Sequence, residues 1–312
     1  MGKIAFLFSG QGAQSVGMGQ ELYNNYDCCR KIFERASKSL DMDLMQLCFH
    51  GPIEKLNLTE YTQPTVVTVS LGALEVFSQY GIKPDLAAGF SLGEYSAYTA
   101  AGVFDLETVI PLVQKRGRYM QEAVPEGKGK MVAVLGLSSQ QIDEICKRAS
   151  QYGIVSGANY NCPGQTVIGG EVVAVEKASE LAIEAGAKKV VSLALSAPFH
   201  TIMLEEAAER LAVELDAITL GKPKFSLVSN VTADYIPEDK IKDLLKLQVK
   251  SPVLWEQSVQ RMIADGVDTF IEFGPGKTLS GFVKRIDRSL TVTNVCDLRS
   301  LENTLKLFDI KQ

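Results

Sequence analysis

The sequence predicts an α/β protein in which a mostly parallel sheet is interrupted by a smaller βαββαβ unit. Outside residues 128–196, short apolar runs that suit buried strands alternate with helical patterns, which favours a parallel sheet with helices on both faces. Within residues 128–196, the order strand, helix, strand, strand, helix, strand is the split βαβ, or ferredoxin-like, arrangement. The 312 residues are enough for one large domain or for two.

The first part of the chain supplies the beginning of the parallel sheet. The apolar run KIAFLF at 3–8 ends in Ser-Gly-Gln-Gly, which indicates a buried strand that leads into a loop. The other elements expected before residue 124 are helices at 20–40 and 65–80, a strand at 86–88, and helices at 92–101 and 106–123. The last of these helices ends in VPEGKGK, a composition typical of a domain linker.

The insert and the end of the chain complete the pattern. The elements expected in the insert are strands at 131–136, 154–159, 166–169 and 189–195, and helices at 138–152 and 172–185. Ser138 or Ser139 is expected to cap the N-terminus of the first of these helices. The elements expected after it are helices at 204–217 and 258–264 and strands at 225–228 and 269–272. We therefore expect one domain made of residues 1–127 and 197–312, and a second domain made of residues 128–196.

Composition and charge argue against several classes of protein. A net charge of -5 without a long basic run argues against nucleic acid as a partner. No stretch approaches about 20 apolar residues, so no membrane span is expected. The six cysteines include no C-x-x-C pair, so neither a zinc site nor a disulfide framework is indicated. The start of the chain resembles a strand rather than a signal peptide, so we expect a reducing cytosol.

The pentapeptide Gly-Phe-Ser-Leu-Gly at 89–93 places Ser91 in a G-x-S-x-G motif between an expected strand and an expected helix. A turn of this kind exposes a serine hydroxyl close to free N–H groups at the helix start, and the glycines allow close backbone approach. The pattern therefore predicts a nucleophilic serine. The alternative is an ordinary glycine-rich turn.

A serine needs a base, and the chain has two histidines. His50 lies in a helix-ending loop and is interpreted as a structural or surface residue. His200 directly follows an expected strand, where open α/β sheets place their sites, and the order of Ser91 before His200 matches α/β-hydrolase-like chains. The alternative is a loop histidine without a catalytic role.

No acidic residue between the serine and the histidine stands out as the third member of a triad. The acids weighed for that place are Asp105, Asp143 and Glu171, which lie soon after the serine or within the insert. We therefore favour a Ser91–His200 dyad whose imidazole is held by a neutral acceptor.

Two further features fit acyl chemistry. The loop Ser-Gly-Gln-Gly puts Gln11 after the first strand. The backbone N–H groups of Gln11 and Leu92 are candidates for binding an oxyanion. The alternative for this loop is a simple turn.

Arg116 lies on an expected helix between Lys115 and Arg118. One of these arginines points inward to grip a carboxylate, or all are solvated, and the residues alone leave both options open.

Together these motifs resemble the malonyl-CoA:acyl carrier protein transacylases of bacterial-type fatty acid synthesis, over essentially the whole chain. The resemblance rests on seven ordered motifs: FLFSGQGAQ, GFSLGEYSA, QKRGRYMQEAVPEG, NYNCPGQTVIGG, SAPFH, LQVKSPVLW and EFGPGKTLSGF. It implies an α/β-hydrolase-like, mostly parallel catalytic domain with an inserted ferredoxin-like subdomain.

The resemblance also implies a role for each motif. Ser91 would carry the malonyl group as an ester, and His200 would act as base and then as acid. Gln11 and Leu92 would bind the oxyanion through their backbone N–H groups, and Arg116 would pair with the free carboxylate of the malonyl group.

Three other positions follow from the same resemblance. The backbone carbonyl of Gln248 would orient His200 in place of a triad acid, and Asn161 would lie near the site. Phe199 is similar to the residue found in malonyl-selective members. Phe90 is a departure, because the family usually has histidine just before the serine, and any role of that imidazole is absent here.

The expected activity is ping-pong transfer of malonyl from malonyl-CoA to the phosphopantetheine thiol of holo acyl carrier protein, in the cytoplasm, without a bound cofactor or metal. One alternative is a serine thioesterase or other hydrolase. A second is a non-catalytic carrier-binding protein, against which the presence of both Ser91 and His200 argues. Because carrier proteins are typically acidic, a basic docking patch is expected. Its candidates are Lys128, Lys130, Lys188, Lys189 and Arg285.

Overall fold

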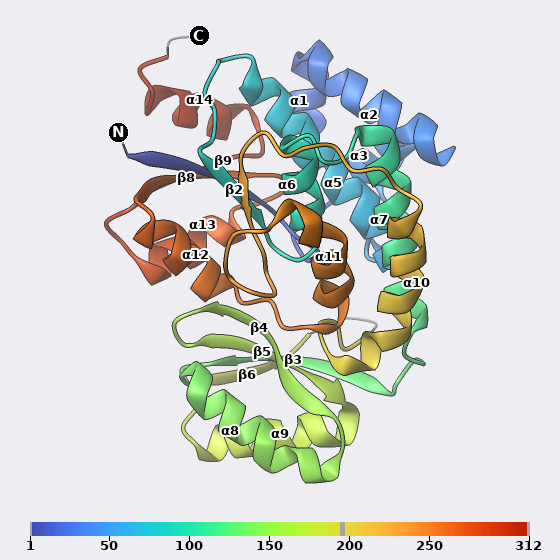
Figure 1. Cartoon of the computed structure of the whole chain (residues 1–312), viewed down its shortest axis with the longest axis vertical. Helices are drawn as coiled ribbons and strands as arrows, with labels where there is room; N and C mark the ends of the chain where they lie inside the picture. The colour runs from blue at the N-terminus through green and yellow to red at the C-terminus, as the bar shows by residue number, and fades with distance from the viewer. Residues whose placement is uncertain (1, 194–196, 311–312) are drawn as a thin grey trace.

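The computed structural model describes residues 2–193 and 197–310, and it contains two sheets (Figure 1). The larger sheet has five strands in the order β7-β2-β1-β8-β9, and all neighbouring pairs are parallel. Its strands are β1 (Lys3–Phe8), β2 (Leu86–Gly89), β7 (Ser226–Val228), β8 (Val267–Phe273) and β9 (Thr291–Val295). The predicted parallel sheet is therefore confirmed.

Helices cover both faces of this sheet (Figure 1). Successive side chains of a strand point to opposite faces, and both faces carry apolar side chains that need to be covered. Phe6 and Phe8 of β1 pack into one core with α5 (Thr59–Ser78) and α7 (Leu106–Glu122), while Ala5 and Leu7 pack into a second core with α12 (Trp255–Ala264) and α13 (Thr278–Ile286). The helices before the insert are α1 (Gln20–Asn25), α2 (Asp27–Leu40), α3 (Leu44–His50), α4 (Ile53–Leu56), α5 (Thr59–Ser78), α6 (Gly93–Ala100) and α7 (Leu106–Glu122). The helices after it are α10 (Glu205–Asp216), α11 (Ile241–Lys250), α12 (Trp255–Ala264), α13 (Thr278–Ile286) and α14 (Leu298–Lys306).

The smaller sheet is antiparallel, with the order β4-β5-β3-β6. Its strands are β3 (Gly129–Leu135), β4 (Val155–Cys162), β5 (Gln165–Glu171) and β6 (Lys189–Ser192), and its helices are α8 (Ser139–Ala149) and α9 (Val172–Glu184). The two helices cover the face that points away from the larger unit (Figure 1). The element order and the strand order together confirm the ferredoxin-like insert.

Two details of the insert refine the expectations. Ser138, not Ser139, caps α8, in a capping box with Gln141. The expected strand at 189–195 ends at Ser192, and its last two residues lie outside the described residues, as does Ser196 of the SAPFH motif. We propose that the two domains divide at 127/128 and at 196/197; the second of these positions also falls next to undescribed residues.

A short extended segment joins the two units. The N–H of Tyr160 in β4 donates to the carbonyl of Val253, and the N–H of Val253 donates to the carbonyl of Ala158, both over 2.9 Å. The stretch between α11 and α12 therefore extends the edge of the small sheet. Among the described residues, no helix is long and apolar enough to cross a membrane.

The turn between β2 and α6 has the tight geometry that its glycines predict. Ser91 has a φ of 50°, in the left-handed region that side chains rarely adopt. A Cβ on Gly89 would lie 1.8 Å from the carbonyl carbon of Gly93, and a Cβ on Gly93 would lie 2.1 Å from the carbonyl oxygen of Phe8. Glycine is therefore required at both positions because backbone meets backbone.

We predict that Gly93→Ala lowers the free energy of unfolding by about 1–3 kcal/mol, because the added methyl group has to push β1 and α6 apart. Urea unfolding monitored by circular dichroism measures the change. Gly281→Ala is the matched control: its Cβ would enter open space within α13, and replacing a helical glycine stabilises by up to about 1 kcal/mol. Equal stability of the two variants would contradict this account of the turn.

Candidate active site

The structure brings Ser91 and His200 together from distant parts of the chain. The Oγ atom of Ser91 lies 2.7 Å from Nε2 of His200, and both residues are buried. His200 has a φ of 61°, so both members of the pair occupy the left-handed region. Such backbone costs on the order of 1–3 kcal/mol and persists only where its surroundings hold it.

The other ring nitrogen of His200 faces two backbone carbonyls. Nδ1 lies 2.8 Å from the carbonyl oxygen of Gln248 and 3.2 Å from that of Ser251. Carbonyls only accept hydrogen bonds, so Nδ1 carries the proton and Nε2 is left to accept from the Ser91 hydroxyl. Burial, and then the charge of Arg116, lower the pKa of His200 to about 4. The imidazole is therefore neutral near pH 7 and able to act as a base.

Asn230 fixes the turn that carries the serine. Its Oδ1 accepts from the N–H of Ser91 over 2.6 Å, and its Nδ2 donates to the carbonyl of Gly89 over 2.7 Å. Asn230 is fully buried in the loop after β7, and its segment carries no pattern that would have marked it in the sequence.

The two backbone N–H groups expected to bind an oxyanion are available. Within the part of the chain that the structure describes, neither Gln11 nor Leu92 donates its backbone N–H to another group. Leu92 is fully buried at the start of α6, and the side chain of Gln11 is held by Thr59 Oγ1 at 3.2 Å. The N–H of Ser91 itself is occupied by Asn230.

The structure decides which of the basic residues on α7 points inward. Arg116 is 1 % exposed, whereas Arg118 is exposed and Lys115 pairs with Glu214 on the surface. The Nη1 atom of Arg116 donates to Gln63 Oε1 over 2.9 Å. Its Nη2 atom has two further acceptors: Gln248 Oε1 at 2.9 Å and Ser91 Oγ at 3.3 Å.

Arg116 thus carries a buried charge without a directly bonded carboxylate among the described residues. Its Nε has no hydrogen-bond partner there, and its guanidinium lies 5.3 Å from the centre of the Tyr95 ring. Burial lowers the pKa of Arg116. A buried cation without a bonded carboxylate is costly, so the site favours a negative group beside Ser91.

Glu94 lies one helical turn after Ser91 and is buried with it. Its Oε2 accepts from Gln248 Nε2 over 2.6 Å, and its Oε1 accepts from the backbone N–H of Asn230. Burial raises the pKa of Glu94 to about 8, while these hydrogen bonds and the charge of Arg116 oppose the rise.

Glu94 and Gln63 were not among the residues predicted from sequence. For Glu94 a signal existed, because it is the one charged residue in GEYSAYTAA, the segment that follows the serine. Gln63 gave no such signal, since it lies in the long apolar helix α5 without a motif around it.

Asn161 and Gln11 line one cavity of about 380 Å³. Asn161 is 4 % exposed on β4, and its Oδ1 has no hydrogen-bond partner among the described residues. Phe90 lines the same cavity and packs against Trp255 and Phe282, with ring centres 5.5 and 6.3 Å away. The position before the serine is therefore part of an aromatic cluster, which suits phenylalanine.

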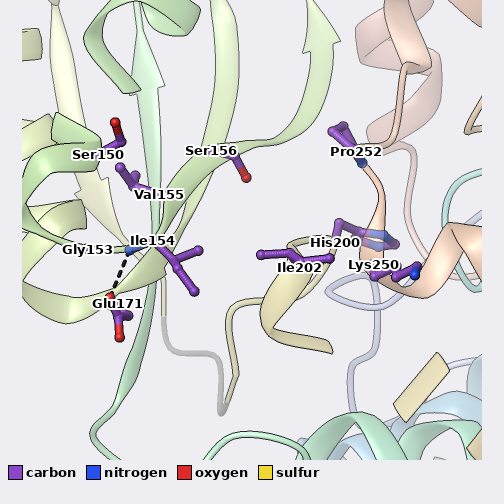
Figure 2. A pocket seen from close by; sticks show the side chains of 10 residues that line it. All are labelled: Ser150, Gly153, Ile154, Val155, Ser156, Glu171, His200, Ile202, Lys250 and Pro252. Atoms are coloured by element: carbon purple, nitrogen blue, oxygen red, sulfur yellow. Dashed lines mark hydrogen bonds between the residues drawn. The ribbon is translucent and has the colours of Figure 1, made fainter. Parts of the chain in front are cut away.

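His200 lines a second cavity, of about 630 Å³ (Figure 2). His200, Ile202, Lys250 and Pro252 face the beginning of β4 across it, and Ile154 and Ile202 are exposed. The site therefore lies where the large and small units meet. No group of His, Cys, Asp and Glu in the described ranges is arranged to hold a metal, and His50 is exposed at the end of α3.

Comparisons with known proteins agree with this geometry. Residues 5–300 match the family model described as an acyl transferase domain. The chain is 45% identical over 304 residues to the malonyl CoA-acyl carrier protein transacylase of Bacillus subtilis, covering 97% of this chain and 96% of the relative. It is 42% identical to that of Escherichia coli K12 over 309 residues, covering 98% of this chain and 100% of the relative.

Solved structures give the same result. The transacylase of that name from Clostridium perfringens has a TM-score of 0.96 at 50% identity, with 98% of this chain and 97% of the other covered. A malonyl-transacylase in complex with a type II PKS acyl-carrier protein has a TM-score of 0.95 at 41% identity, with 98% and 99% covered. The chain therefore belongs to the family of malonyl-CoA:acyl carrier protein transacylases.

Proposed function

We propose that this protein transfers the malonyl group of malonyl-CoA to the phosphopantetheine thiol of holo acyl carrier protein. The observation that carries the proposal is Arg116, a buried cation 3.3 Å from Ser91 Oγ whose hydrogen-bond acceptors are neutral. An acyl group with a free carboxylate, esterified to Ser91, supplies the counter-charge that the site lacks. The names of the relatives support the same substrate and acceptor.

In the first half-reaction His200 Nε2 takes the proton of the Ser91 hydroxyl, and Oγ attacks the thioester carbonyl of malonyl-CoA. The N–H groups of Gln11 and Leu92 bind the resulting oxyanion. The intermediate collapses with cleavage of the carbon–sulfur bond. The proton on His200 passes to the departing sulfur, which leaves CoA and a malonyl-Ser91 ester.

The second half-reaction reverses these roles. His200 takes the proton of the phosphopantetheine thiol, and the sulfur attacks the ester carbonyl. The oxyanion forms again in the same place. Ser91 leaves and recovers its proton from His200, and malonyl-carrier protein is the product. The backbone carbonyl of Gln248 holds the imidazole in the tautomer that both halves require.

Asn161 has a role on the substrate side in this proposal. Its unpartnered Oδ1 is an acceptor for an N–H group of a ligand in the cavity shared with Gln11. The phosphopantetheine arm, which is common to donor and acceptor, carries amide N–H groups. The proposed steps require no bound cofactor or metal, and this stays a prediction, as does a cytoplasmic location.

The docking surface for the carrier protein also remains a prediction. Four of the five candidates, Lys128, Lys188, Lys189 and Arg285, are exposed. Lys130 is half-buried and pairs with Glu176, so its charge is partly offset.

Labelling distinguishes transfer from hydrolysis. Incubation with malonyl-CoA alone should add one malonyl group per chain, measured by intact mass, and holo acyl carrier protein should remove it. Ser91→Ala should not be labelled, whereas Ser78→Ala, a change on the exposed end of α5, should be labelled as the wild type is. CoA release without a stable adduct would favour the thioesterase alternative.

Arg116→Ala should lose selectivity for malonyl over acetyl. We expect malonyl transfer to fall by about 2–5 kcal/mol in transition-state stabilisation, the usual cost of removing one partner of a buried charge pair. Acetyl transfer should fall less, since acetyl has no carboxylate. The ratio of kcat/KM for the two CoA esters measures this. Arg118→Ala, on the exposed face of the same helix, is the control, and an unchanged ratio in Arg116→Ala would refute the assignment.

The low pKa of His200 predicts an acid-tolerant acylation step. A base with a pKa of about 4 stays neutral as the pH falls through 6.5, the ordinary value for histidine, and is protonated only near 4. The rate of Ser91 acylation should therefore stay nearly constant from about pH 7 to about pH 5. Stopped-flow detection of CoA release measures it. A decline centred near 6.5 would mean that the imidazole is not desolvated as the structure shows.

A further inference from the structure

The orientation of the Arg116 guanidinium depends on which hydrogen-bonding atoms of the neighbouring side chains face it. Its two terminal nitrogens meet the amide oxygens of Gln63 and Gln248, each at 2.9 Å. A glutamine side chain can present either oxygen or NH₂ at the same place. Some other group must therefore determine that Gln248 turns its oxygen toward Arg116.

Glu94 is that group. The Nε2 atom of Gln248 donates to Glu94 Oε2 over 2.6 Å and to the backbone carbonyl of Ser91 over 3.0 Å. The carbonyl of Ser91 only accepts, and Glu94 in its carboxylate form accepts at both oxygens, so the nitrogen has to lie on their side and the oxygen has to lie on the side of Arg116. A flipped amide would place N–H groups against the N–H groups of Arg116, and its oxygen against the Glu94 carboxyl.

Glu94 is itself fixed in place. It is 2 % exposed, on the first turn of α6, and its Oε1 accepts from the backbone N–H of Asn230. Asn230 in turn holds the N–H of Ser91 and the carbonyl of Gly89. The carboxyl group is therefore anchored to the turn that carries the nucleophile, and Gln248 extends from it to Arg116.

We propose that Glu94 is a positioning residue for recognition of the acyl carboxylate: through the side chain of Gln248 it directs Arg116 toward the acyl group on Ser91. The inference rests on the proposed function, since that function assigns the substrate carboxylate to Arg116. It gives the side chain of Gln248 a task separate from that of its backbone carbonyl, which orients His200. Glu94 does not touch the reacting atoms.

Glu94→Gln tests the link with almost no change in size. The new side chain can keep an oxygen toward the N–H of Asn230, but it then presents NH₂ to the NH₂ of Gln248. Gln248 relieves that conflict by turning over, which puts its nitrogen toward Arg116. The variant thus removes an acceptor from Arg116 while leaving Arg116 itself, Ser91 and the backbone carbonyl of Gln248 in place.

The measurement is the ratio of kcat/KM for malonyl-CoA to that for acetyl-CoA. We expect Glu94→Gln to lower this ratio roughly 10-fold or more, the scale of one lost hydrogen bond to a charged group. The loss should fall mainly on malonyl-CoA, since acetyl has no carboxylate for Arg116 to meet. Glu214→Gln is the matched control, because Glu214 bonds to Lys115 and Tyr119 on the outer side of α7. It should leave the ratio unchanged.

A second variant keeps the test decisive if Glu94→Gln folds poorly. Gln248→Met removes the side-chain amide and keeps the backbone carbonyl that accepts from His200. It should lower the same ratio to a similar extent. The double variant should show no further decrease, because both changes break one connection. Decreases that multiply in the double variant would contradict action through Gln248.

The outcomes separate the inference from the function on which it rests. A wild-type enzyme that takes up no malonyl group would overturn the proposed function, and the inference with it. A wild type that prefers malonyl, with an unchanged ratio in Glu94→Gln and in Gln248→Met, would overturn the inference alone. An equal loss with both CoA esters would show that Glu94 only supports the fold, which also overturns it.

Discussion

A single arginine charge, buried beside the nucleophile, is the constraint on which this site depends. Arg116 lies 3.3 Å from Ser91 Oγ, and its hydrogen bonds go to the amide oxygens of Gln63 and Gln248. Amide oxygens fix the orientation of the guanidinium but do not neutralise its charge, so the charge stays available to a substrate carboxylate. Burial lowers the pKa of His200 most, and the charge of Arg116 lowers it further, so the same charge helps to keep the imidazole neutral. Recognition of the acyl group and the neutral state of the base thus both depend in part on the charge of Arg116.

Both units of the fold contribute to holding the dyad. Ser91 occupies a left-handed turn between β2 and α6, where Gly89 and Gly93 allow backbone to meet backbone. His200 is held from the other side by the carbonyls of Gln248 and Ser251. The segment after Ser251 pairs with β4, so the small sheet supports the loop that orients the imidazole. This connection explains how an inserted unit can contribute to a site whose dyad lies outside it.

Sequence reasoning found what local pattern encodes and missed what the tertiary structure creates. Ser91 was predictable because its turn needs glycines at fixed positions, and the insert because its six elements follow one order. Gln63 and Asn230 were not, since their roles arise only when α5 and the loop after β7 reach the turn. Two helix boundaries also differ from those expected. The helix expected at 65–80 is Thr59–Ser78, because Pro64 is tolerated inside it. The helix expected at 20–40 breaks at Tyr26. Strand β9 was missed because its half-buried TVTNV lacks a clear apolar run.

The most direct test of the central claim is a crystal structure of the enzyme after brief exposure to malonyl-CoA without carrier protein. We expect a malonyl ester on Ser91 Oγ with its carboxylate paired to the terminal nitrogens of Arg116. The ester carbonyl oxygen should face the N–H groups of Gln11 and Leu92. An ester whose carboxylate turns away from Arg116, toward solvent or either cavity, would contradict the claim that this charge is reserved for the substrate.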